Sequence, residues 1–321
     1  MFLYLKIFKP KMKIFSIFAL ITTSIMEHNY KYNDYIIANH RLRFEGVVGG
    51  WVARCLPSFE PFAVEADPAV ECDMVAVADS ILVDESCVEL TRFDFAEGDA
   101  ECIFLRSDDD YILTIANSTT PTHIFACNRR DTRRVRICVG ESVNASFLRF
   151  GIWLMVNISM AQNSVAAVHS SVIVCHDEAV LFLGESGTGK STHTRLWREN
   201  IEGVQLLNDD SPFIGIRDGK VIAYGSPWSG KTPCYKNESY PIRAIVRLSQ
   251  APHNKIYRLR KMQAIGALLP SLPPAFSFDA ELEDAVMNIL SAVVGGVPMY
   301  HLECLPDAAA AQLSHDTVFE V

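Results

Sequence analysis

The sequence predicts a two-domain α/β (α+β) protein, with a smaller β-rich domain first and a mixed-sheet domain after it. Three observations favour this fold class. The chain has 321 residues, more than one average domain. Residues 27–143 contain short strand-like runs separated by turns. Residues 144–321 begin with an apolar helical segment and then contain a strand, a glycine-rich loop and a helix in succession.

The composition is that of an ordinary globular protein, with 49% hydrophobic and 21% charged residues. A net charge of -9 argues against a nucleic-acid partner, which would normally face a basic surface. Nine cysteines without a C-x-x-C pair fit a reducing compartment and show no metal-site spacing. We therefore expect a cytoplasmic protein whose cysteines are mostly buried.

Residues 1–26 resemble the basic and apolar parts of a secretory signal, because four lysines precede the apolar stretch 14–26. This stretch is shorter than the roughly 20 residues that a membrane span needs. No small-x-small cleavage site follows it. The alternative is that translation starts at Met26 and the upstream segment is a mis-assigned extension. We favour this alternative and expect no stable membrane span.

Residues 27–143 predict a small α+β domain of unknown role with a mostly antiparallel sheet. Alternating or apolar runs predict strands, and Ser107–Asp110 predicts a hairpin turn. The acidic stretch 57–101 is better interpreted as a solvated face than as a metal site or a surface for a basic partner. An arginine cluster at positions 129–134 is likewise better interpreted as exposed than as phosphate-binding. The predicted strands are 35–37, 42–44, 102–105, 111–115 and 134–139.

Asn144 is a suitable N-cap for an apolar helix that extends to about residue 162. Three polar residues interrupt its apolar character, so burial between two domains is favoured over a membrane location. We place the domain boundary near its start, at residues 143–144.

A hairpin follows, in which residues 169–174 form the first strand and residues 175–178 the turn. The short turn requires that the two strands be antiparallel. His169 should then lie beside the loop that begins at Gly184. A lone histidine is often purely structural, but this position favours a functional role.

The loop carries a complete Walker A pattern, Gly184-x-x-x-x-Gly189-Lys190-Ser191. Glycines permit backbone conformations in which amides point inward and surround phosphate oxygens at a helix N-terminus. Lys190 could reach the outer phosphates, and Ser191 could supply a hydroxyl ligand to Mg²⁺. The expected nucleotide-binding residues are Gly184, Glu185, Ser186, Gly187, Thr188, Gly189, Lys190, Ser191 and Thr192.

The helix after the loop should end at Gly203 as a C-cap. The next strand, residues 204–210, ends in Asp209 and Asp210. Carboxylates at this edge of a sheet suit two tasks: one can hold Mg²⁺, and the other can accept a proton from an attacking hydroxyl. A simple Asn-Asp turn is the alternative.

The remaining residues predict a hairpin at 213–224, strands at 242–248 and 299–303, and helices at 263–269, 279–292 and 308–313. Between them, residues 225–232 form a glycine-rich loop. Its Lys231 could neutralise charge on a transferring phosphoryl group, or could be an exposed lysine in a structural turn.

The combination of His169, the hairpin into the glycine loop and the Asp209-Asp210 pair resembles the catalytic domain of HPr kinase/phosphorylase. The resemblance covers roughly residues 167–231 and not the N-terminal half. It implies a nucleotide-binding fold of the phosphoenolpyruvate-carboxykinase type for residues 144–321. It also implies ATP- and Mg²⁺-dependent transfer to a hydroxyl of a protein or small molecule, with His169 and one aspartate assisting deprotonation.

Two other functions remain open at this point. A non-catalytic nucleotide-binding regulatory module would use the same loop but would need no base. Carboxykinase chemistry would need arginines for a dicarboxylate, and Arg195, Arg217, Arg243 and Arg247 are available. The acceptor is not identified by the sequence, and a homo-oligomer is also left open.

Overall fold

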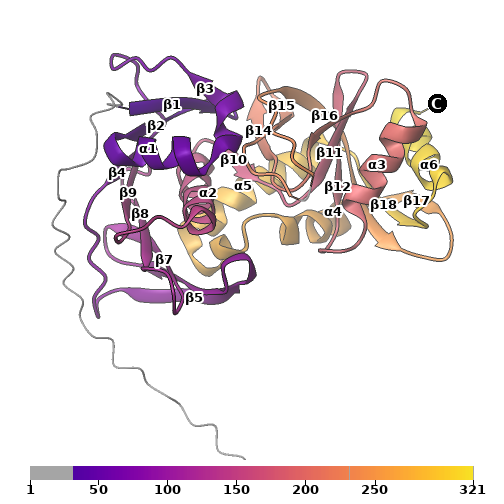
Figure 1. Cartoon of the computed structure of the whole chain (residues 1–321). Coiled ribbons are helices and arrows are strands. Elements are labelled where there is room, and N and C mark those ends of the chain that lie inside the picture. The colour runs from indigo at the N-terminus through magenta and orange to yellow at the C-terminus, as the bar shows by residue number, and fades with distance from the viewer. Residues whose placement is uncertain (1–31, 231, 321) are drawn as a thin grey trace, which may run out of the picture.

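The computed structural model describes residues 32–230 and 232–320. Two β-sheets, each of nine strands, lie at opposite ends of the molecule with helices between and around them (Figure 1). The protein is therefore a mixed α/β structure. The predicted N-terminal extension, residues 1–26, and Lys231 lie outside the described residues. No helix of the described residues has the length and apolar character needed to cross a bilayer.

The first sheet has the strand order β3-β1-β2-β4-β9-β8-β7-β6-β5. Its pairs are antiparallel except for β2–β4 and β4–β9, in agreement with the prediction of a mostly antiparallel sheet. Ser107 closes the predicted hairpin turn by donating its amide to the Asp110 carbonyl over 2.9 Å. The strands are β1 (Tyr32–Ile37), β2 (His40–Glu45), β3 (Ala63–Val64), β4 (Met74–Ala78), β5 (Val88–Phe95), β6 (Ala100–Arg106), β7 (Asp110–Ala116), β8 (His123–Asn128) and β9 (Arg134–Cys138).

Three short helices in this half were not predicted: α1 (Gly46–Cys55), η1 (Pro57–Phe62) and η2 (Ala96–Gly98). Glycines weaken a helix, and α1 has three of them among its first five residues. Burial of Val48 and Val52 against the first sheet overrides that preference. The acidic stretch is also more structured than expected, since it contains β4 and the half-exposed β5.

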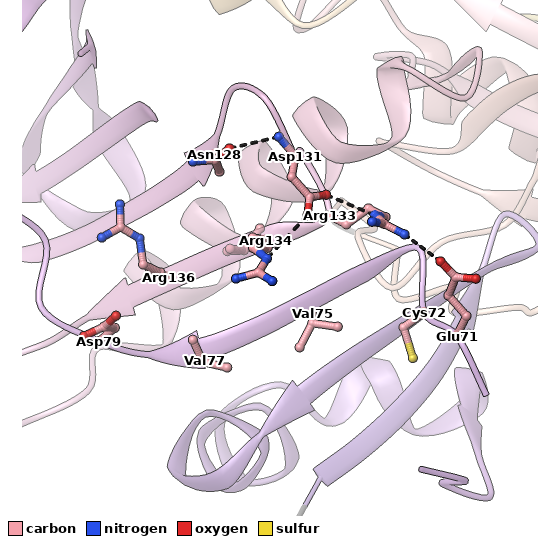
Figure 2. A pocket seen from close by; sticks show the side chains of 11 residues that line it. Glu71, Cys72, Val75, Val77, Asp79, Asn128, Asp131, Arg133, Arg134 and Arg136 are labelled. Atoms are coloured by element: carbon pink, nitrogen blue, oxygen red, sulfur yellow. Dashed lines mark hydrogen bonds and ion pairs between the residues drawn. The ribbon is translucent and has the colours of Figure 1, made fainter. Parts of the chain in front are cut away.

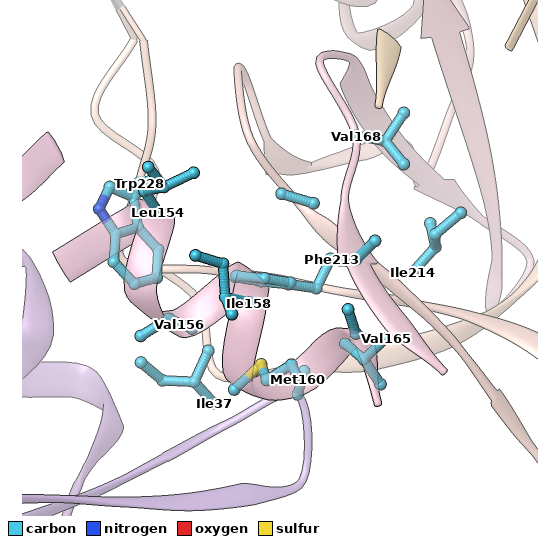
Figure 3. Packing of buried hydrophobic residues seen from close by; sticks show 14 of the residues in the cluster. Ile37, Leu154, Val156, Ile158, Met160, Val165, Val168, Phe213, Ile214 and Trp228 are labelled. Atoms are coloured by element: carbon cyan, nitrogen blue, oxygen red, sulfur yellow. The ribbon is translucent and has the colours of Figure 1, made fainter. Parts of the chain in front are cut away.

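Helix α2 (Ala145–Ala161) begins where predicted, and the Asn144 side chain accepts hydrogen bonds from the amides of Ser146 and Phe147. The helix packs against β8 of the first sheet and β10 of the second. Figure 3 shows Met160 of α2 near both Ile37 of β1 and Val165 of β10. One hydrophobic cluster thus runs from the first sheet through α2 into the second. The division of the chain into two domains stays a prediction.

The second sheet has the order β10-β14-β15-β16-β12-β11-β13, with β18 beside β16 and β17 beside β18. It is mixed, because β12–β16 and β16–β18 are parallel and the other pairs antiparallel. Its strands are β10 (Val165–Ala167), β11 (Ser171–Cys175), β12 (Glu178–Leu183), β13 (Gln205–Asn208), β14 (Phe213–Arg217), β15 (Lys220–Tyr224), β16 (Ser239–Gln250), β17 (Lys255–Arg258) and β18 (Met299–Cys304). The helices are α3 (Lys190–Asn200), α4 (Lys261–Leu268), η3 (Leu269–Ser271), η4 (Pro274–Phe278), α5 (Ala280–Gly296) and α6 (Ala308–Phe319).

Several element boundaries differ from the prediction. The strand predicted at 204–210 ends at Asn208, so Asp209 and Asp210 lie in the turn that follows β13. His169 lies between β10 and β11 rather than in a strand, because its amide donates to the carbonyl of Ser271 and not to a strand neighbour. Helix α3 ends at Asn200, and the next residue, Ile201, is already extended. Gly203 has a positive φ of 76° in the turn that follows, where a glycine is favoured.

Asp279 joins the two halves of the chain away from the hydrophobic cluster. Its carboxylate caps α5 and also accepts hydrogen bonds from Arg106 (2.7 Å) and from the hydroxyl of Tyr111 (2.8 Å) on the first sheet. The side chain is buried, and these donors hold the pKa of its carboxyl below the ordinary value despite burial. The first sheet is thereby fixed to a helix that covers the second.

Candidate functional site

The topology of the second sheet brings three predicted segments to one edge. β11 is antiparallel to both β12 and β13. The carboxyl ends of β12 and β13 and the amino end of β11 therefore meet at the same edge. The glycine loop follows β12, the twin aspartates follow β13, and His169 lies just before β11. This edge is the candidate site.

The glycine loop connects β12 directly to α3. Three glycines of this loop have positive φ values, a backbone conformation that residues with a side chain disfavour. The values are 153° at Gly184, 82° at Gly187 and 104° at Gly189. Gly189 precedes α3, and no side chain caps that helix end in the described structure. The first amides of α3 are therefore available as hydrogen-bond donors at the positive end of the helix dipole.

Lys190 lies folded against the loop. Its ammonium donates to the carbonyl of Gly184 over 2.7 Å and to that of Glu185 over 3.2 Å. It also lies 3.0 Å from His169 Nε2. The side chain is only 9% exposed, and burial lowers its pKa, partly offset by the charges of Asp210 and Asp209.

His169 connects Lys190 to Asp210. An ammonium can only donate, so Nε2 of His169 accepts the hydrogen bond from Lys190. The other ring nitrogen, Nδ1, lies 3.2 Å from Asp210 Oδ1 and donates to it. Both His169 and Asp210 are close to half-exposed, at 47% and 42% of their side-chain surface, so a ligand can reach them.

Asp209 is buried directly beside this pair, with 6% of its surface exposed. Its Oδ1 accepts a hydrogen bond of 2.5 Å from the hydroxyl of Ser171, which also lies 3.2 Å from the hydroxyl of Thr194 on α3. Its Oδ2 is buried without a hydrogen-bond partner among the described residues. A buried carboxylate oxygen of this kind is suited to a cation.

Asn208 shapes the turn that carries both aspartates. Its Oδ1 accepts hydrogen bonds from the amides of Asp210 (3.0 Å) and Ser211 (2.9 Å). Its Nδ2 donates to the carbonyl of Trp228 over 3.0 Å. Asn208 thus connects the aspartate turn to the loop 225–230. The turn at Asn208 was weighed in the sequence only as an alternative to a functional pair of aspartates, and the contact of Asn208 with this loop was missed.

The loop 225–230 is held from the first half of the chain as well. The ring of Trp228 lies edge-on to that of Phe59 in η1, at 5.2 Å between centroids. Its indole donates to the carbonyl of Arg149, and the Arg149 guanidinium donates to the carbonyl of Ser229 over 2.9 Å. A Cβ on Gly230 would lie 2.8 Å from the Asp209 carbonyl oxygen, so this loop touches the aspartate turn. No local pattern in the sequence indicates these contacts.

The other predicted residues line the same loop. Lys190 contacts His169, and His169 in turn contacts Asp210. Asp209 lies beside them. Gln250, at the end of β16, donates to the carbonyl of Gly187 over 3.3 Å and so fixes the far side of the loop. Glu185, Ser186, Gly187 and Ser191 are exposed, while Gly184, Thr188, Gly189 and Thr192 are half-buried.

No group of three or more His, Cys, Asp or Glu side chains in the described residues is arranged to hold a metal ion by itself. A cation at the aspartates would therefore need ligands from a bound molecule. The nine cysteines all lie in the described part of the chain and are unpaired.

A hollow of about 540 Å³ lies elsewhere, on the first sheet over β4 and β9 (Figure 2). Arginines line it, but carboxylates already pair with them. Arg133 contacts Glu71 over 2.6 Å and Asp131 over 3.0 Å, and Arg134 also contacts Asp131. The interpretation of the arginine cluster as a solvated surface holds for Arg130 and Arg134, whose side chains are 81% and 80% exposed. It is wrong for Arg129, whose side chain is 18% exposed and pairs with Glu281 of α5.

No protein-family model matches the chain, and no curated protein matches it by sequence. Among solved structures, it is similar to the HPr(Ser) kinase/phosphatase from Coxiella burnetii at 12% identity and a TM-score of 0.29. The similarity covers 48% of this chain and 93% of the other. A TM-score of this size does not establish a common fold, so the function is inferred from the contacts described above.

Proposed function

We propose that this protein is an ATP- and Mg²⁺-dependent phosphotransferase that moves the terminal phosphoryl group to a hydroxyl of a protein or small molecule. The main support is the line of contacts from Lys190 through His169 to Asp210, at 3.0 Å and 3.2 Å, beside a glycine loop. A cation, an imidazole and a carboxylate next to such a loop are the groups that phosphoryl transfer to a hydroxyl needs.

In this proposal the amides of residues 184–192 hold the phosphates at the start of α3. The Lys190 ammonium stops donating to the loop carbonyls and donates to phosphate oxygens instead. Nε2 of His169 then no longer accepts a hydrogen bond from Lys190. The acceptor oxygen forms a bond to the terminal phosphorus while the bond to the bridging oxygen breaks and ADP leaves. The hydroxyl proton passes to Asp210, whose orientation is fixed by Nδ1–H of His169.

The residues present fit a magnesium ion. Asp209 offers its unpartnered Oδ2, and Ser191 offers an exposed hydroxyl at the start of α3. Mg²⁺ is usually held by one or two carboxylates together with substrate phosphates, so two protein ligands suffice. When bound, it would neutralise charge on the phosphates. Lys231 stays a predicted further cation.

Carboxykinase chemistry is less well supported. Arg195 pairs with Glu199 over 2.8 Å, and Arg243 donates to the Val318 carbonyl. Arg217 lies over the ring of Tyr224. Three of the four candidate arginines are therefore engaged elsewhere.

The test is incubation of the protein with γ-labelled ATP, Mg²⁺ and a cell extract, followed by identification of labelled products. We expect Lys190→Ala to lose nucleotide binding and Asp210→Asn to keep binding but lose transfer. Lys220→Ala, at the exposed start of β15, is the matched control. Parent-like turnover in both site variants would contradict the assignment. Binding without a labelled product in any fraction would instead favour a regulatory nucleotide-binding module.

A further inference from the structure

A second cavity lies beside the loop that touches the aspartates. Its volume is about 300 Å³, at the small end of the range for ligand sites. Residues 55–58 of the first half form one wall, the start of α2 forms another, and Tyr235 closes it from the second half. Such a space suits a small molecule or the end of a larger one.

Arg149 of α2 lines this cavity and has no carboxylate within ion-pair distance in the described parts of the chain. Its one described side-chain hydrogen bond is to the carbonyl of Ser229, which leaves further N–H donors. The arginines of the larger hollow differ, since Arg133 and Arg134 are paired with acids. A half-buried, unpaired guanidinium is suited to bind a carboxylate or phosphate through two parallel hydrogen bonds.

The cavity is connected to the reaction centre through a single stretch of backbone. Ser229 contacts Arg149, and the next residue, Gly230, lies against the aspartate turn. A Cβ on Gly230 would be 3.3 Å from Asp210 Cβ and 3.7 Å from its Cγ. Arg149 and Asp210 therefore lie against adjacent residues of the same loop.

We propose that this cavity holds an anionic group of the phosphoryl acceptor, a carboxylate or a phosphate, and that Arg149 binds it. This inference rests on the proposed function and specifies its substrate class. It also gives the first half of the chain a role, since residues 55–58 complete the acceptor site.

The probes are D-glycerate, with a carboxylate, sn-glycerol 3-phosphate, with a phosphate, and glycerol, with neither. Each is titrated at millimolar concentration against the full chain with Mg²⁺ and a non-hydrolysable ATP analogue, and then tested as an acceptor of label from γ-labelled ATP. We expect at least one anion to bind and become labelled, whereas glycerol does not. The stronger of the two anions identifies the group that the site prefers.

Arg149→Met should weaken anion binding by at least about ten-fold more than it weakens ATP binding, since it removes hydrogen bonds to a charged group. Arg149→Lys should recover only part of the affinity, because it lacks the planar fork. Arg134→Met, at an exposed position, should have no effect. Failure of both anions to bind, or equal binding by Arg149→Met, overturns the inference while ATP binding persists. If the parent protein does not bind ATP, the proposed function itself is overturned.

Discussion

Replacing Asp209 with asparagine is expected to stabilise the nucleotide-free protein and to abolish magnesium-dependent nucleotide binding. The side chain is 6% exposed, and its Oδ2 has no partner in the described residues. A buried polar group left unpaired costs roughly 1–3 kcal/mol, and more when it is charged. Asparagine keeps an oxygen for Ser171 and removes the charge, but its amide NH₂ stays unpaired. We therefore expect a gain of about 1 kcal/mol in the free energy of unfolding.

The assay is urea-induced unfolding at neutral pH, with and without Mg²⁺ and ATP. Ligand at about 100 times its Kd should stabilise the parent protein by about 2.7 kcal/mol, and the variant not at all. Asp210→Asn is the matched control, since its half-exposed pair with His169 adds little stability. A variant less stable than the parent would refute the argument from burial. Equal stabilisation by Mg²⁺ and ATP would refute the metal assignment.

Two further predictions concern stability. Burial lowers the pKa of His193 from 6.5 to about 4, so its contribution is complete above pH 6.5 and is lost as the pH falls toward 4. In urea unfolding, His193→Gln should reduce the loss of stability between pH 7 and pH 4 by about 2–3 kcal/mol, and an unchanged loss would contradict this. Asp279→Ala should cost about 3 kcal/mol, because it removes the cap of α5 and leaves Arg106 and Tyr111 without their buried acceptor. Asp307→Ala, which removes the cap of α6 and one hydrogen bond from Asn254, should cost about 1–2 kcal/mol in the same assay, and equal costs for the two variants would contradict the prediction.

Local patterns explain which parts of the second sheet could be predicted. The order of strand, glycine loop and helix follows from residue types within a short window. So does the existence of the next strand, although it was predicted to include Asp209 and Asp210 and ends at Asn208. The short turn between β11 and β12 is enough to place His169 near the loop. The prediction that His169 belongs to a strand was wrong. The amide of His169 donates to the carbonyl of Ser271, about a hundred positions away in the chain. Contacts of this range are not encoded in a local pattern.

The contacts around the aspartates depend on packing in the same way. Asn208 contacts the loop 225–230 through side-chain hydrogen bonds, and Arg149 reaches Ser229 from a different part of the chain. Nothing in their neighbouring residues indicates these partners. Helix α1 shows the same limit, since burial of Val48 and Val52 decides its conformation against the preference of its glycines.

The contacts of Trp228 and Asp279 predict that residues 144–321 will not function as an isolated fragment. Phe59 packs against Trp228 in the loop beside the aspartates, and Arg106 with Tyr111 satisfies the buried carboxylate of Asp279. Removing the first half would expose the apolar face of α2 to water and leave that carboxylate without its side-chain donors.

The fragment therefore retains each predicted nucleotide-binding residue but should aggregate, or bind ATP far more weakly than the full chain in titration calorimetry. Full-length Phe59→Ala is the matched comparison, because it removes the packing on Trp228, together with that on Tyr35 and Phe44, and keeps the rest of the first half. It should cost about 3–5 kcal/mol of stability and reduce phosphoryl transfer while the chain still folds. A monomeric, folded fragment with the affinity of the full chain would contradict this prediction. In that case the first half would be an independent domain, and its contacts with the aspartate loop would not be needed for binding.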